Sequence, residues 1–209
     1  MLTINNLVKR HGSQEILSNI SFEAHPGRVT GFLGPNGAGK SSTLRIILGL
    51  DQATSGSALV NGVAYRELTN PLTTGGAALG GASAHRTRTG RAHLRWGARS
   101  AGFPSSRVDE VLEMVGLSKA ASMRVGKYSL DMSQRLGLAT ALLGDPDILI
   151  LDEPVNGLDP EGIRWIRMFL RERARAGNTV LLSSHLMGEL TETVDDVVII
   201  NKGKIMSDG

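Results

Sequence analysis

Apolar residues along this chain recur with two periods, and their alternation predicts an α/β fold. Short apolar runs that end at Gly, Pro or Asn are typical of buried strands, whereas apolar residues three and four apart are typical of helices. The predicted strands are 2–8, the segment with Ile16, Ile20 and Phe22, 29–33, 58–60, 148–151, 180–183 and a hairpin over 197–206. Segment 9–12 is predicted to be a basic turn, and 72–81, rich in Gly, Ala and Thr, shows no pattern.

Helical spacing predicts two helices that alternate with these strands. Leu44, Ile47 and Leu48 form an apolar stripe that stops at Gly49. Asp159 followed by Pro160 is typical of a helix N-terminus, because Asp caps the first turn and Pro fits its first position. This second helix is expected to end at Gly177 and to bury Ile163, Ile166, Phe169 and Leu170.

The segment from about 86 to 144 gives helical signals and no strand signals. Ser106 and Asp109 could cap a helix that Gly116 ends, and a further helix carries Leu136, Ala139, Leu142 and Leu143. This pattern indicates a small helical insert between two halves of an α/β core. We predict one domain over 1–209, with the core at 1–80 and 145–209 and the insert at about 81–144.

The composition agrees with a globular protein. The chain has 209 residues, 41% of them hydrophobic, and no run of eighteen apolar residues that would span a membrane. It begins without the layout of a secretion signal and contains no cysteine, which excludes thiolate metal sites and suits the cytoplasm. The net charge of +3 is too small to indicate nucleic-acid binding.

The positive charge is concentrated in one segment. No Asp or Glu occurs from 68 to 108, where the chain carries Arg86, Arg88, Arg91, Arg95, Arg99 and Arg107. Two interpretations stay open: a solvated basic face, or a docking surface for an acidic partner or an anionic membrane.

The segment Gly34–Ser41 fits the pattern G-x-x-x-x-G-K-[ST] of a phosphate-binding loop. It lies between a predicted strand and a predicted helix, the context in which glycine N–H groups and a helix N-terminus surround a polyphosphate. Lys40 would reach the β- and γ-phosphates, and the Ser41 hydroxyl would hold Mg²⁺. The predicted nucleotide-binding residues are Gly34, Pro35, Asn36, Gly37, Ala38, Gly39, Lys40, Ser41 and Ser42.

Three further candidates follow buried strands. Asp152 and Glu153 end the apolar run 148–151, and ligands of open α/β sheets bind beyond the carboxyl ends of the strands. Asp152 would help to hold Mg²⁺ opposite Ser41, and Glu153 would polarise the attacking water. His185 follows the next buried strand and could sense a γ-phosphate.

The motifs occur in an order that resembles the ATP-binding subunit of ABC transporters. After the phosphate-binding loop come 129–135, 148–154, 157–159 and His185, and 141–146 makes the chain most similar to the bacterial drug- and bacitracin-exporter type. The resemblance covers the whole chain. It implies a P-loop NTPase core with a mostly parallel sheet and an antiparallel β part, plus a small helical subdomain. It also implies ATP and Mg²⁺ as ligands.

The resemblance further implies a head-to-tail dimer, of two identical or two different subunits, that holds two ATP molecules between them. Ser129 would touch the γ-phosphate bound by the other subunit, Asp159 would cross the interface, and His11 would stack on adenine. Dimer closure would energise a membrane-spanning permease on which the insert docks. The chain is therefore expected in the cytoplasm, on the inner face of the cell membrane, with no nucleic-acid partner.

Three positions depart from the family pattern. Family members usually carry an aromatic residue near His11 that stacks on adenine, and histidine stacks more weakly. The glutamine expected at the start of the insert is replaced by Gly80 or Gly81, which offer no side chain to Mg²⁺ or water. Asp131 stands where the signature segment usually has glycine. Two unit charges about 5 Å apart repel by roughly 3 kcal/mol at an effective dielectric constant of 20, so Asp131 is expected to weaken ATP-driven closure and slow turnover. The milder alternative is that Asp131 turns outward and caps the helix.

Two other functions compete with an ATPase subunit of an exporter. Relatives that act on DNA insert long coiled coils and those that act on ribosomes usually carry two such domains, neither of which this sequence shows. A degenerate subunit would bind ATP and regulate a partner without turnover, an alternative that Asp131 and the missing glutamine favour. Glu153 and His185 count against it.

Overall fold

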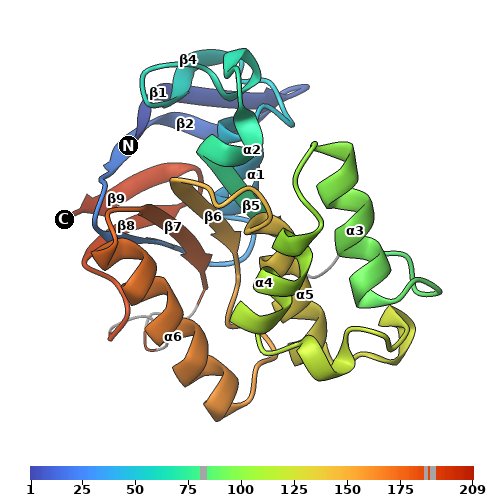
Figure 1. Cartoon of the computed structure of the whole chain (residues 1–209). Coiled ribbons are helices and arrows are strands. Elements are labelled where there is room, and N and C mark those ends of the chain that lie inside the picture. Colours follow the sequence, from blue (N-terminus) through green and yellow to red (C-terminus); the bar gives the residue numbers. More distant parts are fainter. Residues whose placement is uncertain (81–83, 186–187, 189–191) are drawn as a thin grey trace.

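The computed structural model describes residues 1–80, 84–185, 188 and 192–209 and contains two β-sheets (Figure 1). The smaller sheet is antiparallel and has the order β2-β1-β4, with β1 Leu2–His11, β2 Gln14–Ala24 and β4 Ser55–Val60. The larger sheet has the order β5-β6-β7-β3-β8-β9. Its strands are β3 Val29–Leu33, β5 Gly75–Leu79, β6 Ile148–Asp152, β7 Thr179–Ser184, β8 Asp196–Asn201 and β9 Lys204–Asp208. All are parallel to their neighbours except β9, so the expected mostly parallel sheet with an antiparallel part is confirmed.

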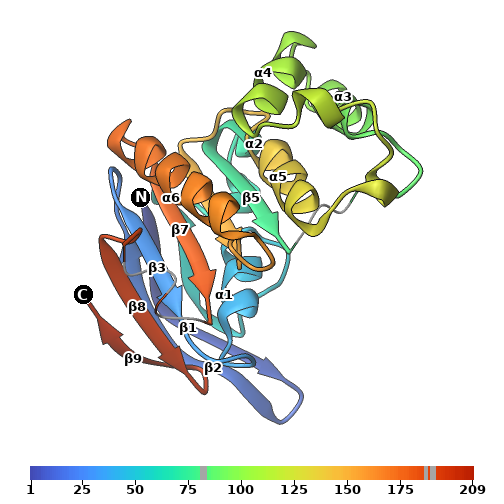
Figure 2. The same cartoon turned by 90° about the horizontal axis from the view of Figure 1, so that it is seen from below.

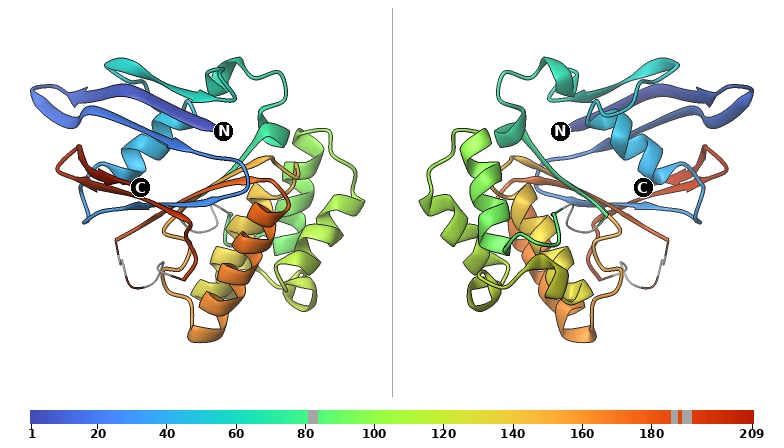
Figure 3. Two further views of the ribbon diagram at one scale, coloured as in Figure 1. Left: turned by 90° about the vertical axis from the view of Figure 1, so that its left-hand side faces the viewer. Right: turned by 90° about the vertical axis from the view of Figure 1, so that its right-hand side faces the viewer.

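The helices lie around the larger sheet in layers. Figure 3 shows α1 and the smaller sheet on one side of it and α5 and α6 on the other. Figure 2 shows α3, α4 and α5 grouped beside the edge strand β5. The α-helices are α1 Lys40–Ile47, α2 Pro71–Thr74, α3 Gly90–Ser100, α4 Ser106–Met114, α5 Leu130–Ala141 and α6 Pro160–Arg175. No helix among the described residues is long and apolar enough to cross a membrane.

The central strands β3, β6 and β7 are buried almost throughout because both faces of the sheet are covered. Leu149 and Leu151 of β6 pack in a cluster with α6 and the helical insert. Ile148 and Ile150 point the other way, into a cluster with α1 and the smaller sheet. Each covered face thus receives alternate residues, which explains the unbroken apolar run of β6.

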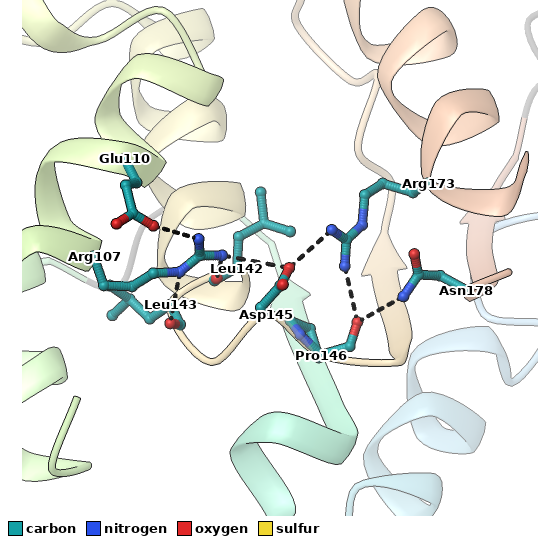
Figure 4. Close-up of polar contacts among 8 residues, drawn as sticks. All are labelled: Arg107, Glu110, Leu142, Leu143, Asp145, Pro146, Arg173 and Asn178. Carbon is teal, nitrogen blue, oxygen red and sulfur yellow. Dashed lines mark hydrogen bonds and ion pairs between the residues drawn. The ribbon is translucent and has the colours of Figure 1, made fainter. Parts of the chain in front are cut away.

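Helices α3, α4 and α5 fall inside the predicted insert, whose domain bounds of about 81–144 stay a prediction. The chain leaves the insert at Asp145, where ion pairs and hydrogen bonds join it to α4 and α6 (Figure 4). Asp145 Oδ1 lies 3.4 Å from Arg107 Nη2 and 2.9 Å from Arg173 Nη1. Arg173 and Asn178 both donate to the carbonyl oxygen of Pro146, at 3.0 and 3.1 Å. The insert is therefore tied to the core by side chains at this junction.

Two local predictions are wrong. Segment 9–12 is not a basic turn, because β1 continues to His11 and Arg10 pairs with Glu15 of β2 at 3.0 Å. Ser106 does not cap a helix, because it is the first residue of α4; the N-cap is Ser105, whose side chain makes no capping hydrogen bond.

Strand β5 was not predicted. It begins with Gly75-Gly76-Ala77-Ala78, which gives neither an apolar run nor an alternation. A Cβ on Gly76 would lie 2.1 Å from the carbonyl oxygen of Ala141 at the end of α5. The strand is therefore built from small residues because the insert packs directly on it, a reason that local pattern does not reveal.

Candidate active site

The phosphate-binding loop leaves β3 at Gly34 and ends in the first turn of α1. Gly39 is the N-cap of α1 and has φ +111°, a conformation that favours glycine. A Cβ there would lie 2.5 Å from Leu17 Cδ2, and a Cβ on Gly34 would lie 2.2 Å from the carbonyl oxygen of Ile200. Close packing on backbone therefore requires glycine at position 34, and the backbone conformation favours glycine at position 39.

Lys40 is the most buried cation in this region, with a side chain that is 6% exposed. Its Nζ donates to the carbonyl oxygens of Gly34, at 2.6 Å, and Pro35, at 3.4 Å. It also lies 3.5 Å from Glu153 Oε1. Because this buried ammonium contacts only carbonyl oxygens and one carboxylate, it can bind a further anion such as a phosphate oxygen.

Ser41 and Asp152 meet as predicted, although they are 111 residues apart in the chain. Ser41 Oγ donates to Asp152 Oδ2 at 2.8 Å, and the other carboxylate oxygen accepts a short hydrogen bond from Ser183 Oγ. Ser183 belongs to β7 and is fully buried. Sequence analysis included Ser183 in a strand but did not recognise it as a site residue, since nothing local distinguishes its hydroxyl.

Glu153 and His185 lie at adjacent strand ends. Glu153 Oε2 is 2.8 Å from His185 Nδ1, and the Glu153 N–H donates to Ser183 Oγ at 3.0 Å. The backbone of Glu153 has φ +52°, which a residue other than glycine adopts at a cost of about 1 kcal/mol or more. This strained position directs the carboxylate between Lys40 and His185.

A groove of about 450 Å³ opens over these residues. It is lined by Gln14, Ile16, Asn36, Gly37, Gly39, Lys40, Ser41, Ser42 and Glu153. Sequence analysis did not identify Gln14 and Ile16, which come from the adjoining strand β2. His11 does not line the groove, although it is paired in register with Gln14 at the end of the β1–β2 hairpin. Its contact with adenine stays a prediction.

The groove suits a magnesium-bound polyphosphate. Lys40 supplies a buried positive charge, and Ser41 and Asp152 place two oxygen ligands at one point. In ATPases Mg²⁺ usually takes only one or two ligands from the protein and the rest from phosphate and water. No group of three or more His, Cys, Asp or Glu that could hold a metal occurs among the described residues.

Three other predicted residues lie at helix starts outside this groove. Ser129 is the N-cap of α5, where its side chain accepts from the Met132 N–H at 3.1 Å. Asp159 is the N-cap of α6, as predicted, and accepts from the Gly162 N–H at 2.7 Å. Asp131 lies in the first turn of α5 but caps nothing: both its oxygens face Arg135 Nε, at 3.0 and 2.9 Å.

Gly80 and Gly81, the predicted substitutes for the missing glutamine, follow β5. Leu79 is paired in register with Asp152, so Gly80 lies one residue beyond the Mg²⁺ candidate on the neighbouring strand. Gly80 has φ +64° and offers no side chain there. Gly81 lies outside the described residues.

Comparison with known proteins identifies the family. The family model described as "ABC transporter" matches residues 17–156. The chain is 41% identical to an uncharacterized ABC transporter ATP-binding protein, YhcH, of Bacillus subtilis (strain 168), over 99% of this chain and 68% of the relative. It is 39% identical to the bacitracin transport ATP-binding protein BcrA of Bacillus licheniformis, over 100% and 69% of the two chains.

A solved structure agrees on the fold. A dimeric bacterial ABC transporter cassette superposes with a TM-score of 0.89, over 100% of this chain and 98% of the other, at 21% identity. A second family model, described as an AAA domain, matches only 132–191. The chain therefore belongs to the ATP-binding subunits of ABC transporters, which are ATPases whose hydrolysis is coupled to transport.

Proposed function

We propose that the groove over Lys40 binds ATP with Mg²⁺ and hydrolyses it to energise an exporter. The observation that carries this proposal is one continuous set of contacts. It joins Ser41 to Asp152, Asp152 to Ser183, Ser183 to Glu153, and Glu153 to both Lys40 and His185. These contacts link α1 with the carboxyl ends of β6 and β7, and three of the residues, Lys40, Ser41 and Glu153, line the groove.

Each residue in this set has a role that its contacts suggest. Lys40 and the N–H groups of the loop would bind phosphate oxygens, and Ser41 with Asp152 would hold Mg²⁺. Bound Mg²⁺ would neutralise charge on the phosphate oxygens. Glu153 would accept a proton from the attacking water at its carboxylate, and His185 would orient that carboxylate through Nδ1. Ser183 would keep the Asp152 carboxylate and the Glu153 backbone in place.

A second ATP-binding subunit would complete the site. Ser129 and Asp159 begin α5 and α6, and neither lines the groove over Lys40 among the described residues. We propose that they serve the nucleotide of the second subunit in a head-to-tail dimer. The partner would be a second copy of this chain or a related subunit.

A membrane-spanning permease would be the other partner. An apolar groove of about 300 Å³ lies where the insert meets the core, and its lining includes Leu50, Leu72, Gly97, Phe103 and Leu143. Leu50 and Leu72 are 57% and 49% exposed. We propose that the permease docks here, with the basic segment of α3 beside it, and that the chain works on the cytoplasmic face of the membrane. The bacitracin transport relative supports an exporter of that kind.

ATP binding and hydrolysis by the purified chain test the proposal. Lys40→Ala is expected to weaken ATP binding at least tenfold, and Glu153→Gln to keep binding but lose turnover by about a hundredfold or more. Lys119→Ala, an exposed lysine of the insert, is the control for loss of one positive charge. Tight binding without turnover, unchanged by Glu153→Gln, would contradict the proposal and indicate a regulatory subunit.

A further inference from the structure

The first turn of α5 uses Ser129, not Asp131, to satisfy its backbone. Ser129 Oγ accepts the hydrogen bond from the Met132 N–H at 3.1 Å. The Asp131 carboxylate is turned along the helix toward Arg135, four residues on, and the pair lies 2.9 Å apart. Their side chains are 28% and 17% exposed, so the pair is sheltered from solvent on most sides. The charge of Asp131 thus has an intramolecular partner.

Arg135 in turn joins α5 to two other elements. Its Nη1 donates to the carbonyl oxygen of Val115, just after α4, at 3.1 Å. Its guanidinium carbon lies 4.3 Å from the ring centroid of Trp165 on α6. Trp165 is itself stacked on Phe169, with 5.6 Å between ring centroids. A guanidinium in this position binds the ring face through its charge, provided that the side chain stays in place.

The same end of α5 packs on the loop that leads to Asp159. Gly157 has φ +76°, and a Cβ there would lie 2.1 Å from Leu130 Cδ2. A Cβ on Gly162, in the first turn of α6, would lie 2.9 Å from Asp131 Oδ1. Gln134 Nε2 donates to the carbonyl oxygen of Asn156 at 3.3 Å. Because Gly157 and Gly162 have no side chains, the start of α5 can pack closely against the start of α6 and the loop before it.

We propose that Asp131 is a positioning residue: it holds Arg135 against Trp165 and so fixes the start of α5 on the loop that carries Asp159. This is the opposite of the repulsive role expected from the sequence. A carboxylate paired at 2.9 Å presents a dipole instead of a bare charge, and the field of a dipole falls off faster with distance. Only the consequences at the second subunit rest on the proposed dimer; the arrangement itself belongs to one chain.

The test uses the nucleotide-free full chain, so its failure is distinct from failure of the proposed function. Trp96 and Trp165 are the two tryptophans, and Trp96→Phe leaves Trp165 as the only indole fluorophore. In that background Asp131→Asn is expected to increase acrylamide quenching of Trp165 measurably and to lower Tm by about 2–4 °C. Asp131→Glu keeps a carboxylate four residues before Arg135 and should restore most of both readouts.

Two comparisons show whether Asp131 acts through Arg135. Glu113→Gln removes an exposed carboxylate of α4 that has no ion pair among the described residues, and it should change neither readout. In a Trp165→Leu background, Asp131→Asn should lower Tm by less than half as much, because the stacking partner is already absent.

A result equal to the Glu113→Gln control, in both quenching and Tm, would overturn the proposal. An undiminished decrease in Tm on Asp131→Asn in the Trp165→Leu background would also overturn it, since Asp131 would then act independently of the stack. The repulsive role would instead be detected as a change in dimerisation, measured in the Glu153→Gln background with ATP. There, Asp131→Asn would strengthen dimerisation while leaving Trp165 quenching unchanged, an outcome that also contradicts a positioning role.

Discussion

Arg107 is predicted to stabilise the insert mainly through carbonyl groups and only slightly through ion pairs (Figure 4). Its Nη2 and Nε donate to the carbonyl oxygens of Leu142 and Leu143, at 2.9 and 3.1 Å, just beyond the end of α5. The arginine side chain is 13% exposed, whereas its acidic partners Glu110 and Asp145 are 50% and 60% exposed. Water therefore screens the two ion pairs but has little access to the donated hydrogen bonds.

The expected loss in free energy of unfolding follows from this difference in exposure. Hydrogen bonds from a charged donor contribute about 1.5 kcal/mol each at the lower end of the usual range, and exposed ion pairs about 0.5 kcal/mol or less. Arg107→Ala should thus lower the free energy of unfolding by about 3–4 kcal/mol and Tm by about 6–16 °C. Asp145→Asn should cost less than about 1 kcal/mol, because it removes only the solvent-screened ion pairs with Arg107 and Arg173. Asn tolerates the φ of +48° at this position, and Arg107 keeps both carbonyl partners.

Urea unfolding followed by circular dichroism measures both variants, with thermal unfolding as a second probe. Arg95→Ala provides the control, because this arginine of α3 is exposed and has no ion pair among the described residues. If Asp145→Asn destabilises the chain as much as Arg107→Ala, the reasoning is refuted, since the ion pairs of Asp145 would then carry the effect. An Arg107→Ala variant as stable as Arg95→Ala would refute it as well.

Three further predictions concern the site and the insert. Glu153→Gln should accumulate an ATP-bound dimer, visible by gel filtration, and a variant that stays monomeric with ATP would count against the proposed dimer. Ser41→Ala should raise the Mg²⁺ concentration needed for half-maximal ATPase about tenfold, and an unchanged requirement would remove Ser41 from the metal site. Burial, and after it the charge of Arg88, lower the pKa of His93 from 6.5, and its Nε2 lies 3.3 Å from Thr140 Oγ1. Because the folded pKa lies below the unfolded one, the contribution of His93 is complete above pH 6.5 and is lost as pH falls toward the folded pKa. His93→Gln should therefore lose less stability between pH 7.5 and about pH 5.5 than the natural chain, measured by urea midpoints; equal losses would contradict this origin.

The sequence is sufficient for those parts of the fold that depend on local pattern. Strands buried on both faces favour apolar runs: β6 shows one at Ile148–Leu151, and β3 and β7 show shorter apolar stretches beside buried Thr and Ser. Gly34–Ser41 carries its own signal, because glycines, lysine and serine at that spacing have few other uses. From these, the neighbouring strand ends could be expected to meet, and Asp152 does lie 2.8 Å from Ser41.

Features that depend on distant packing could not be predicted. Strand β5 consists of small residues because α5 lies against it, and Gly76 gives no local sign of that neighbour. The hydroxyl of Ser183 is buried between Asp152 and the backbone of Glu153, yet in the sequence it ends an ordinary strand. Such contacts form between elements that are distant in the sequence, so the sequence of one element alone does not indicate them.

Asp131 is a different case, because a local sign was present. Asp followed by Arg four residues later on a helix is a known stabilising pair. The expectation of repulsion treated Asp131 as an unpaired charge, whereas its carboxylate is paired with Arg135 in the structure. The structure places Arg135 at 2.9 Å and Trp165 beyond it. Helical i, i+4 partners should therefore be considered before a charge is assigned to an interface.

Both ends of α5 are connected to α6 through arginine side chains. At its start, Arg135 of α5 lies over Trp165 of α6. Beyond its end, Arg173 of α6 contacts Asp145 and the carbonyl oxygen of Pro146. A displacement of α5 relative to α6 would have to break one of these contacts, so the two helices should move together. Because Ser129 and Asp159 are the N-caps of α5 and α6, this coupling would keep the two proposed interface residues in a fixed relation.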